Sequence, residues 1–352
     1  MTNDHNATMR QSELLSQQAL ASLLGATIDH KLASAAWRLI EDARSIALLA
    51  HEHPDPDALG SALGLAYALE PLGKVCTVAC ADPSPASFTF LPGRERIVTE
   101  LPHLDFDLVI ALDAGEFSRY GRLYEQYNMF FDNATTLNID HHISSSGCGK
   151  VNIIDPVAAA TAELLTVFLA HQGVPIGRES AICLLAGVIT DTRSFEFEAT
   201  TSRTLAAGAY LVACGAVPQD IVKPMYRMKP LAKARLWGET LRTLGTAMDG
   251  RVVWASLTQE QLRAAGATSD MDDGLPSYLM DIEGVALAAL FKEQENGATK
   301  VSLRSAHPYN AAAICQRFGG GGHVRAAGCT LNMPVEQAIA RFTPALEAAV
   351  RA

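Results

Sequence analysis

Residues 51–61 read HEHPDPDALGS, and this stretch guides the interpretation of the whole chain. It brings together the imidazole of His51 and the carboxylates of Asp55 and Asp57, with a proline on either side of Asp55. Because proline disfavours a helix through this segment, we expect both aspartates in extended conformation, from which neighbours two apart aim at different partners. A helix of small and apolar residues should begin near Ala58, and its positive N-terminal end would favour a phosphate beside it.

Continuous apolar runs, typical of strands buried on both faces, recur along the first part of the chain. They are SIALLA (45–50), VCTVAC (75–80), DLVIAL (107–112) and TLNI (136–139). Helical patterns that end at or near a glycine lie between and after these runs, at 58–73, 161–173 and 201–216. This alternation predicts an α/β fold with a parallel sheet.

Metal-seeking side chains follow the apolar segments. They are His51, Asp55 and Asp57 after 45–50, Asp113 after 107–112, Asp140, His141 and His142 after 136–139, and Asp191 after the apolar run 181–190. Because ligands of open parallel sheets bind beyond the carboxyl ends of the strands, we expect this set to meet at one edge. Carboxylates and imidazoles without thiolates suit Mn²⁺, Mg²⁺ or Fe²⁺ better than a structural zinc. Gathered carboxylates repel one another, so we expect two divalent cations, a pair suited to hydrolysis of a phosphate ester.

The pattern changes after about residue 216, where prolines and local positive charge predict a linker at 217–231. We expect a catalytic α/β domain at 1–216, whose first 40 or so residues form an N-terminal extension that contains a helix. A smaller α+β domain is expected at 232–352, with a hairpin around ENGA (295–298) and a helical segment that runs into GGGGH.

Charge and composition exclude several classes of protein. The net charge of −10 argues against binding of long nucleic acid, which relies on clustered Lys and Arg, but not against a small phosphorylated ligand. No apolar run approaches the roughly 18 residues that span a bilayer, and the N-terminus lacks the features of a signal peptide. Seven cysteines without a Cys-x-x-Cys pair indicate reduced thiols. We therefore expect a cytoplasmic protein without a membrane partner, and a homodimer remains open.

Several motifs in this order resemble the DHH phosphoesterase superfamily with its DHH-associated domain, and most closely its bacterial nanoRNase and adenosine 3',5'-bisphosphate (pAp) phosphatase branch. The motifs are HEHPDPDALGS, Asp113 after an apolar strand, DHH at 140–142, GVITDTRSF (187–195) and FGGGGHVRAAG (318–328). The resemblance spans about 45–330 and implies an active site in the cleft between the two domains. This family often has glycine between the two motif aspartates, where this chain has Pro56.

The resemblance also implies roles for individual residues. Six are implied as ligands of two ions, most simply Mn²⁺: His51 and Asp55 for one, Asp57, His141 and Asp191 for the other, and Asp113 as a bridge between them. His142 is implied as a contact to the substrate phosphate and a proton donor, and Asp140 as a carboxylate that orients a histidine. Substrate-binding residues are implied in the second domain: Arg304, Ser305, Gly320, Gly321, Gly322 and His323.

The function that follows from the resemblance is a manganese-dependent hydrolase. It would cleave short oligoribonucleotides, including pApA, to mononucleotides, and pAp to AMP and phosphate, through attack by a hydroxide held between two metal ions. The residues themselves indicate only two-metal hydrolysis of a phosphate ester. A soluble cyclic di-AMP phosphodiesterase and a manganese pyrophosphatase or polyphosphatase remain alternatives, although the late Ser-Arg-Lys-Lys segment of such pyrophosphatases is absent. A non-catalytic nucleotide-binding regulator is disfavoured because all six ligands are present.

Overall fold

The structure, a computed structural model, describes residue 24 and residues 28–351. Contacts within the chain divide it into two compact units, Met1–Met228 and Lys229–Ala352. Most of the expected N-terminal extension lies outside the described residues. Its described part contains α2 (His30–Asp42), whose first turn is capped by the carboxylate of Asp29.

Unit 1 is built on a sheet of five parallel strands in the order β2-β1-β3-β4-β5. The strands are β1 (Ser45–Ala50), β2 (Val75–Cys80), β3 (Leu108–Leu112), β4 (Thr136–Asp140) and β5 (Val151–Ile154). The predicted parallel α/β sheet is confirmed, and β1 to β4 coincide with the four apolar runs. The sequence patterns did not indicate β5, because this short edge strand is only partly buried.

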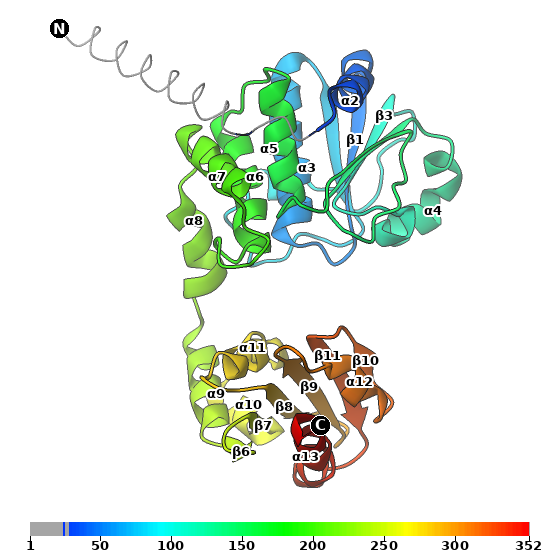
Figure 1. Ribbon diagram of the computed structural model, residues 1–352. Helices are drawn as coiled ribbons and strands as arrows, with labels where there is room; N and C mark the ends of the chain where they lie inside the picture. The colour runs from blue at the N-terminus through cyan, green and yellow to red at the C-terminus, as the bar shows by residue number, and fades with distance from the viewer. Residues whose placement is uncertain (1–23, 25–27, 352) are drawn as a thin grey trace, which may run out of the picture. The chain divides into compact units, whose positions relative to one another are not determined.

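Helices cover both faces of the first sheet (Figure 1). Longer helices of unit 1 are α3 (Pro56–Leu69), α4 (Arg122–Phe131), α5 (Thr161–His171), α6 (Arg178–Asp191) and α7 (Ser202–Ala213), and shorter ones are η1 (Glu70–Leu72), η2 (Arg94–Arg96), η3 (Phe117–Tyr120), α8 (Pro218–Val222) and the π-helix η4 (Lys223–Arg227). Alternate residues of β1 point to opposite faces: Leu48 packs in the core with α3, α5 and α6, and Leu49 packs in the core with α4.

The start of α3 differs from the prediction. The helix begins at Pro56, so Asp57 lies in its first turn, and the expected extended conformation is found only at Asp55, where φ is −101° and ψ is 178°. The reason is that proline's fixed φ and missing N–H suit the first helical position. The carboxylate of Asp55 caps the helix by accepting from the backbone N–H groups of Asp57 and Ala58, both at 2.9 Å. The apolar run 181–190, to which the sequence alone assigned no element, belongs to helix α6.

Unit 2 contains a mixed sheet of six strands in the order β10-β11-β9-β8-β7-β6. The strands are β6 (Gly245–Ala247), β7 (Val252–Leu257), β8 (Leu287–Glu293), β9 (Thr299–Ser305), β10 (Gly321–Gly322) and β11 (Ala326–Leu331). Only β7 and β8 pair in parallel, and β8 and β9 form the expected antiparallel hairpin. The α+β prediction for this part of the chain is therefore confirmed.

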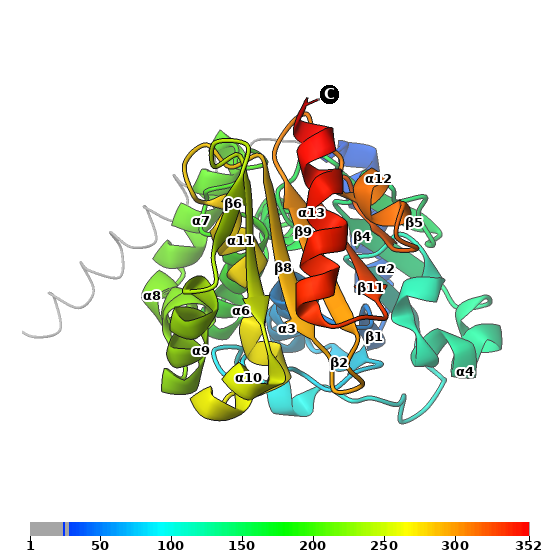
Figure 2. The same cartoon turned by 90° about the horizontal axis from the view of Figure 1, so that it is seen from below.

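Helices also cover both faces of the second sheet. They are α9 (Leu231–Leu241), α10 (Gln259–Ala265) and α11 (Leu275–Met280) on one face, with η5 (Ser269–Asp272) nearby, and α12 (Ala311–Gln316) and α13 (Val335–Arg351) on the other. Figure 2 shows α13 lying along the sheet, where Phe342 packs edge-on against Phe291 of β8.

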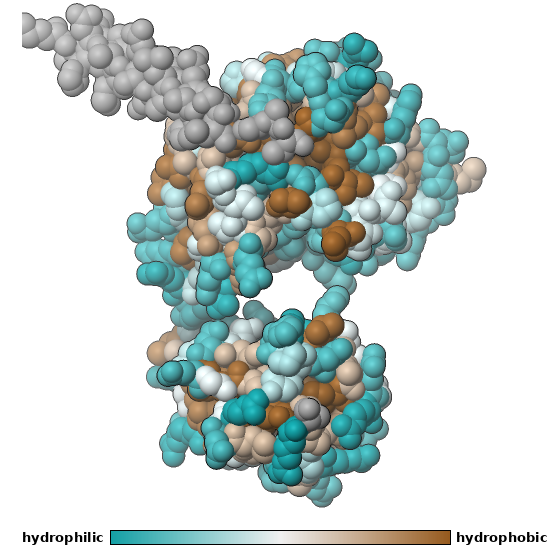
Figure 3. All heavy atoms as spheres, in the orientation of Figure 1, coloured by the Kyte–Doolittle hydropathy of each residue, from teal (hydrophilic) through white to brown (hydrophobic). Residues whose placement is uncertain are grey.

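Within the described residues, no single helix is both long and apolar enough to cross a membrane. Helix α7 and the segment Pro218–Arg227 meet the length and composition criteria only as a pair bent by 103°. Figure 3 shows hydrophilic and hydrophobic residues intermixed over the visible face of each unit.

Candidate active site

The chemistry-bearing side chains of unit 1 meet beyond the carboxyl ends of three neighbouring strands. His51 follows β1, Asp113 follows β3, and the DHH motif at 140–142 spans the end of β4. These strands are adjacent in the order β1-β3-β4, so the chain topology alone brings their ends together. The remaining residues come from helices: Asp55 and Asp57 from the start of α3, and Asp191 from the last position of α6.

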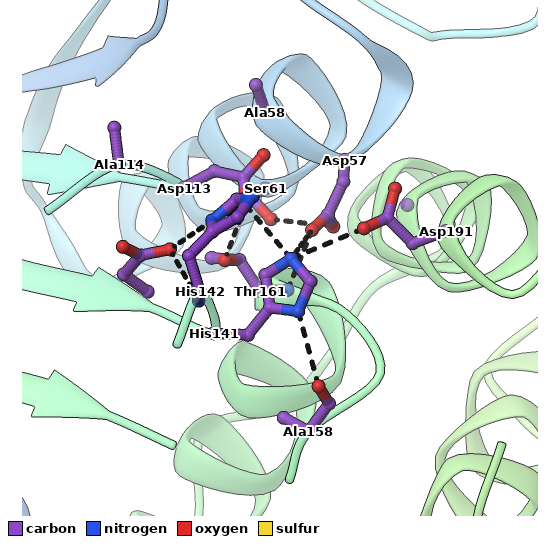
Figure 4. A network of polar contacts seen from close by, with 12 residues as sticks. Asp57, Ala58, Ser61, Asp113, Ala114, His141, His142, Ala158, Thr161 and Asp191 are labelled. Carbon is purple, nitrogen blue, oxygen red and sulfur yellow. Dashed lines mark hydrogen bonds and ion pairs between the residues drawn. The ribbon is translucent and has the colours of Figure 1, made fainter. Parts of the chain in front are cut away.

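Among the described residues, the side chains form three overlapping groups that could each hold a cation, and two of them consist of predicted metal ligands alone. In the His51 group (His51, Asp55 and Asp113) and in the His141 group (Asp57, His141 and Asp191), the donor atoms lie within 4.8 Å of one another. Figure 4 shows Asp57, His141 and Asp191 pointing toward one another. The Nε2 atom of His141 is 3.3 Å from Asp191 Oδ2 and 4.0 Å from Asp57 Oδ2.

Asp113 lies between the two groups. Its Oδ2 is 3.5 Å from His51 Nε2, and its Oδ1 is 3.6 Å from His141 Nε2. The hydroxyl of Thr161 donates to the same Oδ1 at 2.9 Å. Asp113 also has a φ of +58°, a left-handed conformation that aspartate tolerates better than most residues. One carboxylate oxygen therefore faces each histidine.

The backbone fixes which nitrogen of each histidine faces the carboxylates. Nδ1 of His51 is 2.8 Å from the carbonyl oxygen of Glu52, and Nδ1 of His141 is 3.2 Å from that of Ala158. A carbonyl oxygen only accepts, so each Nδ1 carries a proton, and Nε2 is the nitrogen left to bind a cation. In the described part of the chain, the buried Nε2 of His141 has no hydrogen-bond partner. An orphaned nitrogen that faces carboxylates fits a cation ligand.

The protonation of the cluster also indicates a site for cations. Burial, followed by the charges of Asp113 and Asp191, raises the pKa of Asp57 well above its usual range and that of Asp55 to about 6. Burial opposes the charged form of His141, but the nearby carboxylates of Asp191, Asp57 and Asp113 raise its pKa to about 10. Without cations, the cluster thus retains protons that divalent ions would displace. The donor set fits a pair of such ions.

Asp57 is held more firmly than the sequence suggested. It is completely buried, and its carboxylate accepts from the backbone N–H groups of Thr161 at 2.7 Å and Ala162 at 2.9 Å, at the start of α5. A side chain at Gly187 of α6 would come within 2.3 Å of Asp57 Oδ1, so glycine permits this close approach. The prediction missed Thr161 and the carbonyl of Ala158, for which the only signal was a threonine at the start of a predicted helix.

Asp140 and His142 form a separate pair. Oδ1 of the fully buried Asp140 is 2.7 Å from Nδ1 of His142, whose side chain is 48% exposed. This hydrogen bond, partly opposed by burial, raises the pKa of His142. The donor atoms of His142, Asp113 and His141 also lie within 4.8 Å of one another, so the geometry allows His142 to bind either a metal or a substrate.

The predicted substrate residues of unit 2 lie in neighbouring segments of its sheet. Half-buried Arg304 on β9 pairs in register with Ala326 on β11, and His323 is exposed in the turn that leads into β11. The buried Ser305 hydroxyl lies 3.1 Å from the carbonyl oxygen of Tyr309 and 2.9 Å from that of Val324, so it braces this turn.

The conformation of the glycine loop itself requires glycine at two of its positions, Gly320 and Gly322. A side chain at Gly320 would come within 2.1 Å of the Gly328 carbonyl oxygen, and Gly322 has a φ of +136°. A side chain at Gly321, in contrast, would meet no atom within 4 Å. Gly321 is exposed, and its backbone is therefore open to close approach by a ligand.

Comparison with known proteins agrees with this geometry. The model of the DHH family N-terminal domain matches residues 45–188, and that of the DHHA1 domain matches residues 250–352. The chain is 35% identical over 308 residues to the bifunctional oligoribonuclease and PAP phosphatase NrnA of Thermus thermophilus, which covers 86% of this chain and 89% of that protein.

Two further proteins are similar. The cyclic-di-AMP phosphodiesterase PdeA of Listeria monocytogenes is 24% identical over 337 residues, which cover 90% of this chain but 49% of PdeA. The crystal structure of an exopolyphosphatase-related protein from Bacteroides fragilis has a TM-score of 0.80 and 24% identity, covers 92% of this chain and 98% of its own, and shows the shared fold. The matched domain models and the identity to NrnA establish that the chain belongs to the DHH family.

Proposed function

We propose that this chain cleaves short oligoribonucleotides, including pApA, to mononucleotides, and pAp to AMP and phosphate. Its family makes it a hydrolase that acts on phosphate esters. The observation that carries the proposal is the pair of cation-sized donor groups, with the carboxylate of Asp113 facing the histidine of each. The substrates come from the similarity to NrnA, which extends over both matched domains.

The proposal includes two divalent ions, with Mn²⁺ favoured over Mg²⁺ or Fe²⁺. The His51 group would hold one and the His141 group the other, with Asp113 shared between them. Bound there, the ions would neutralise the carboxylates, polarise the phosphate ester and supply a water that loses its proton near neutral pH.

Asp140 and His142 act together as the proton donor to the substrate. The carboxylate of Asp140 fixes the Nδ1 proton of His142 and leaves Nε2 as its free nitrogen. The hydrogen bond to Asp140 raises the pKa of His142 and so favours the protonated ring. His142 therefore contacts the phosphate and donates the Nε2 proton to the departing oxygen, and Asp140 stabilises the imidazolium before that transfer.

Unit 2 supplies the contacts to the remaining substrate charge. The chain as a whole is acidic, so a phosphate needs local donors, and the guanidinium of Arg304, the imidazole of His323 and the amides around Gly321 provide them. Gly320 and Gly322 shape the loop, and Ser305 braces it. Because the phosphate contacts are confined to this small part of the surface, the substrates are short.

A cytoplasmic location fits the free thiols of all seven cysteines.

The similarity to PdeA supports cyclic di-AMP as a second candidate substrate, although the chain spans about half of that protein. The test is a comparison of kcat/KM for the purified chain with Mn²⁺ on pAp, RNAs of two to five nucleotides, pApA, cyclic di-AMP and pyrophosphate. We expect pAp and the short RNAs to be the best substrates. A higher kcat/KM on cyclic di-AMP or pyrophosphate than on all of these would refute the proposal.

A further inference from the structure

Residues 158–162 make hydrogen bonds to three of the proposed ligands: Asp57, Asp113 and His141. In the part of the chain that the structure describes, the same segment makes no hydrogen bond to His51 or Asp55. The His141 group therefore depends on the exact position of this segment (Figure 4), and the His51 group depends on it only through Asp113.

A buried carboxylate lies behind the segment. Glu163, in the first turn of α5, is completely buried. Its Oε2 accepts from the backbone N–H of Ala159 at 3.1 Å and from the hydroxyl of Thr204 at 2.8 Å. Its Oε1 pairs with Nε of Arg203 at the start of α7. Glu163 thus ties residues 158–162 to α7.

The guanidinium of Arg203 links both ends of the loop that precedes α5. While its Nε binds Glu163, its Nη1 donates to Asp155 Oδ2 at 2.8 Å. Asp155 in turn accepts from the backbone N–H groups of Val157 and Ala158, each at 3.0 Å, through its side chain and its carbonyl. The guanidinium of Arg203, whose side chain is 12% exposed, therefore holds both the beginning and the end of this loop in place.

We infer that Arg203 and Glu163 are positioning residues that set the affinity of the ion in the His141 group, through residues 158–162. A buried ion pair adds little net stability, because the loss of hydration offsets the attraction between its charges, but it selects one geometry. Here that geometry places the Ala158 carbonyl against His141 and the first amides of α5 against Asp57. The inference rests on the metal centre of the proposed function.

The test is calorimetric titration of the metal-free full-length chain with Mn²⁺. Wild-type protein should bind two ions. Arg203→Met should weaken one by about ten- to a hundredfold and change the other by less than about threefold, because loss of a residue that orients a metal ligand has effects of this size. In Arg203→Lys, the affinity of the weakened ion should lie between its values in wild type and in Arg203→Met, since lysine keeps the charge but cannot bridge both carboxylates. Glu163→Gln should weaken the same ion as Arg203→Met.

Arg96→Met is the matched control, since it removes one arginine from another arginine–glutamate pair of unit 1, with Glu70, and should leave both affinities unchanged. Circular dichroism confirms that each titrated variant is folded, and if Arg203→Met is not, Arg203→Lys and Glu163→Gln decide. Equal weakening of both ions, no weakening of either, or fewer than two ions in the wild type would overturn the inference. Two ions in a wild-type protein that does not hydrolyse pAp would overturn only the proposed substrates.

Discussion

Replacement of Asp113 by asparagine should separate metal binding from folding. Asparagine keeps the shape of the side chain, tolerates the observed φ of +58°, and can still accept from the hydroxyl of Thr161. It removes the one carboxylate that faces both His51 and His141. Each ion therefore loses a charged ligand, while the metal-free cluster loses a repulsive charge.

Thermal melts with and without Mn²⁺ separate these two effects. Loss of a charged ligand that weakens each ion about a hundredfold removes roughly 2.7 kcal/mol of binding free energy per ion. For a unit of this size, about 1 kcal/mol corresponds to roughly 2–4 °C, so the rise in Tm that saturating Mn²⁺ produces should shrink by about 10 °C or more. The metal-free variant should melt close to metal-free wild type, because removal of the carboxylate relieves its repulsion of Asp55 and Asp57 but also removes its attraction to the protonated rings of His51 and His141.

The assay is a melt of each protein with and without Mn²⁺, together with kcat/KM on pAp, which should fall by several orders of magnitude, roughly a thousandfold or more. Asp105→Asn is a suitable control, since this 89% exposed carboxylate also contacts a histidine, His103, at 2.6 Å. It should change neither quantity. A Mn²⁺-induced rise in Tm equal to that of wild type, or more than about a tenth of wild-type activity, would show that Asp113 does not bridge the two ions.

Four further outcomes are expected. Arg304→Ala and His323→Ala should each lower kcat/KM on pAp about ten- to a hundredfold without changing metal content, and the double variant should lose less than the product of the two; normal kinetics in both single variants would contradict the assignment. Gly320→Ala should lower the free energy of unfolding by about 1–3 kcal/mol because its side chain would meet backbone, whereas Gly321→Ala should leave denaturant stability unchanged and lower only kcat/KM. Activity should fall steeply beyond roughly five nucleotides and depend weakly on salt, because few phosphates are contacted; equal rates on a trimer and a twenty-mer would argue otherwise. The pKa of Asp55 is raised to about 6 and that of His141 to about 10 in the metal-free protein, so Mn²⁺ must displace protons from its ligands; affinity measured by titration should therefore increase with pH through 6 and continue to increase up to about 10, and an affinity independent of pH would contradict this.

The sequence alone predicted the fold class of both units and the side chains that the structure brings together beyond β1, β3 and β4. Apolar runs such as DLVIAL (107–112) predict buried parallel strands, because a strand covered on both faces needs no polar residue. Parallel strands place their carboxyl ends at one edge, so the residues that follow β1, β3 and β4 had to converge. Residue type and order then indicated a pair of cations.

Only the tertiary structure decided how these residues are held. Pro56 could interrupt a helix or begin one, and the capping carboxylate of Asp55 resolved that choice in favour of a helix start. Likewise, the order of residues did not specify that one oxygen of Asp113 faces each histidine, since that depends on the packing of neighbouring loops.

The supporting contacts leave the weakest trace in the sequence. The Ala158 carbonyl that orients His141 is a backbone atom that every residue carries, so no residue type marks it. Arg203 and Glu163 are separated by 40 residues, and each alone is typical of an exposed helix position. Their role exists only because packing of α5 against α7 buries both charges together, and that packing is a property of the folded chain.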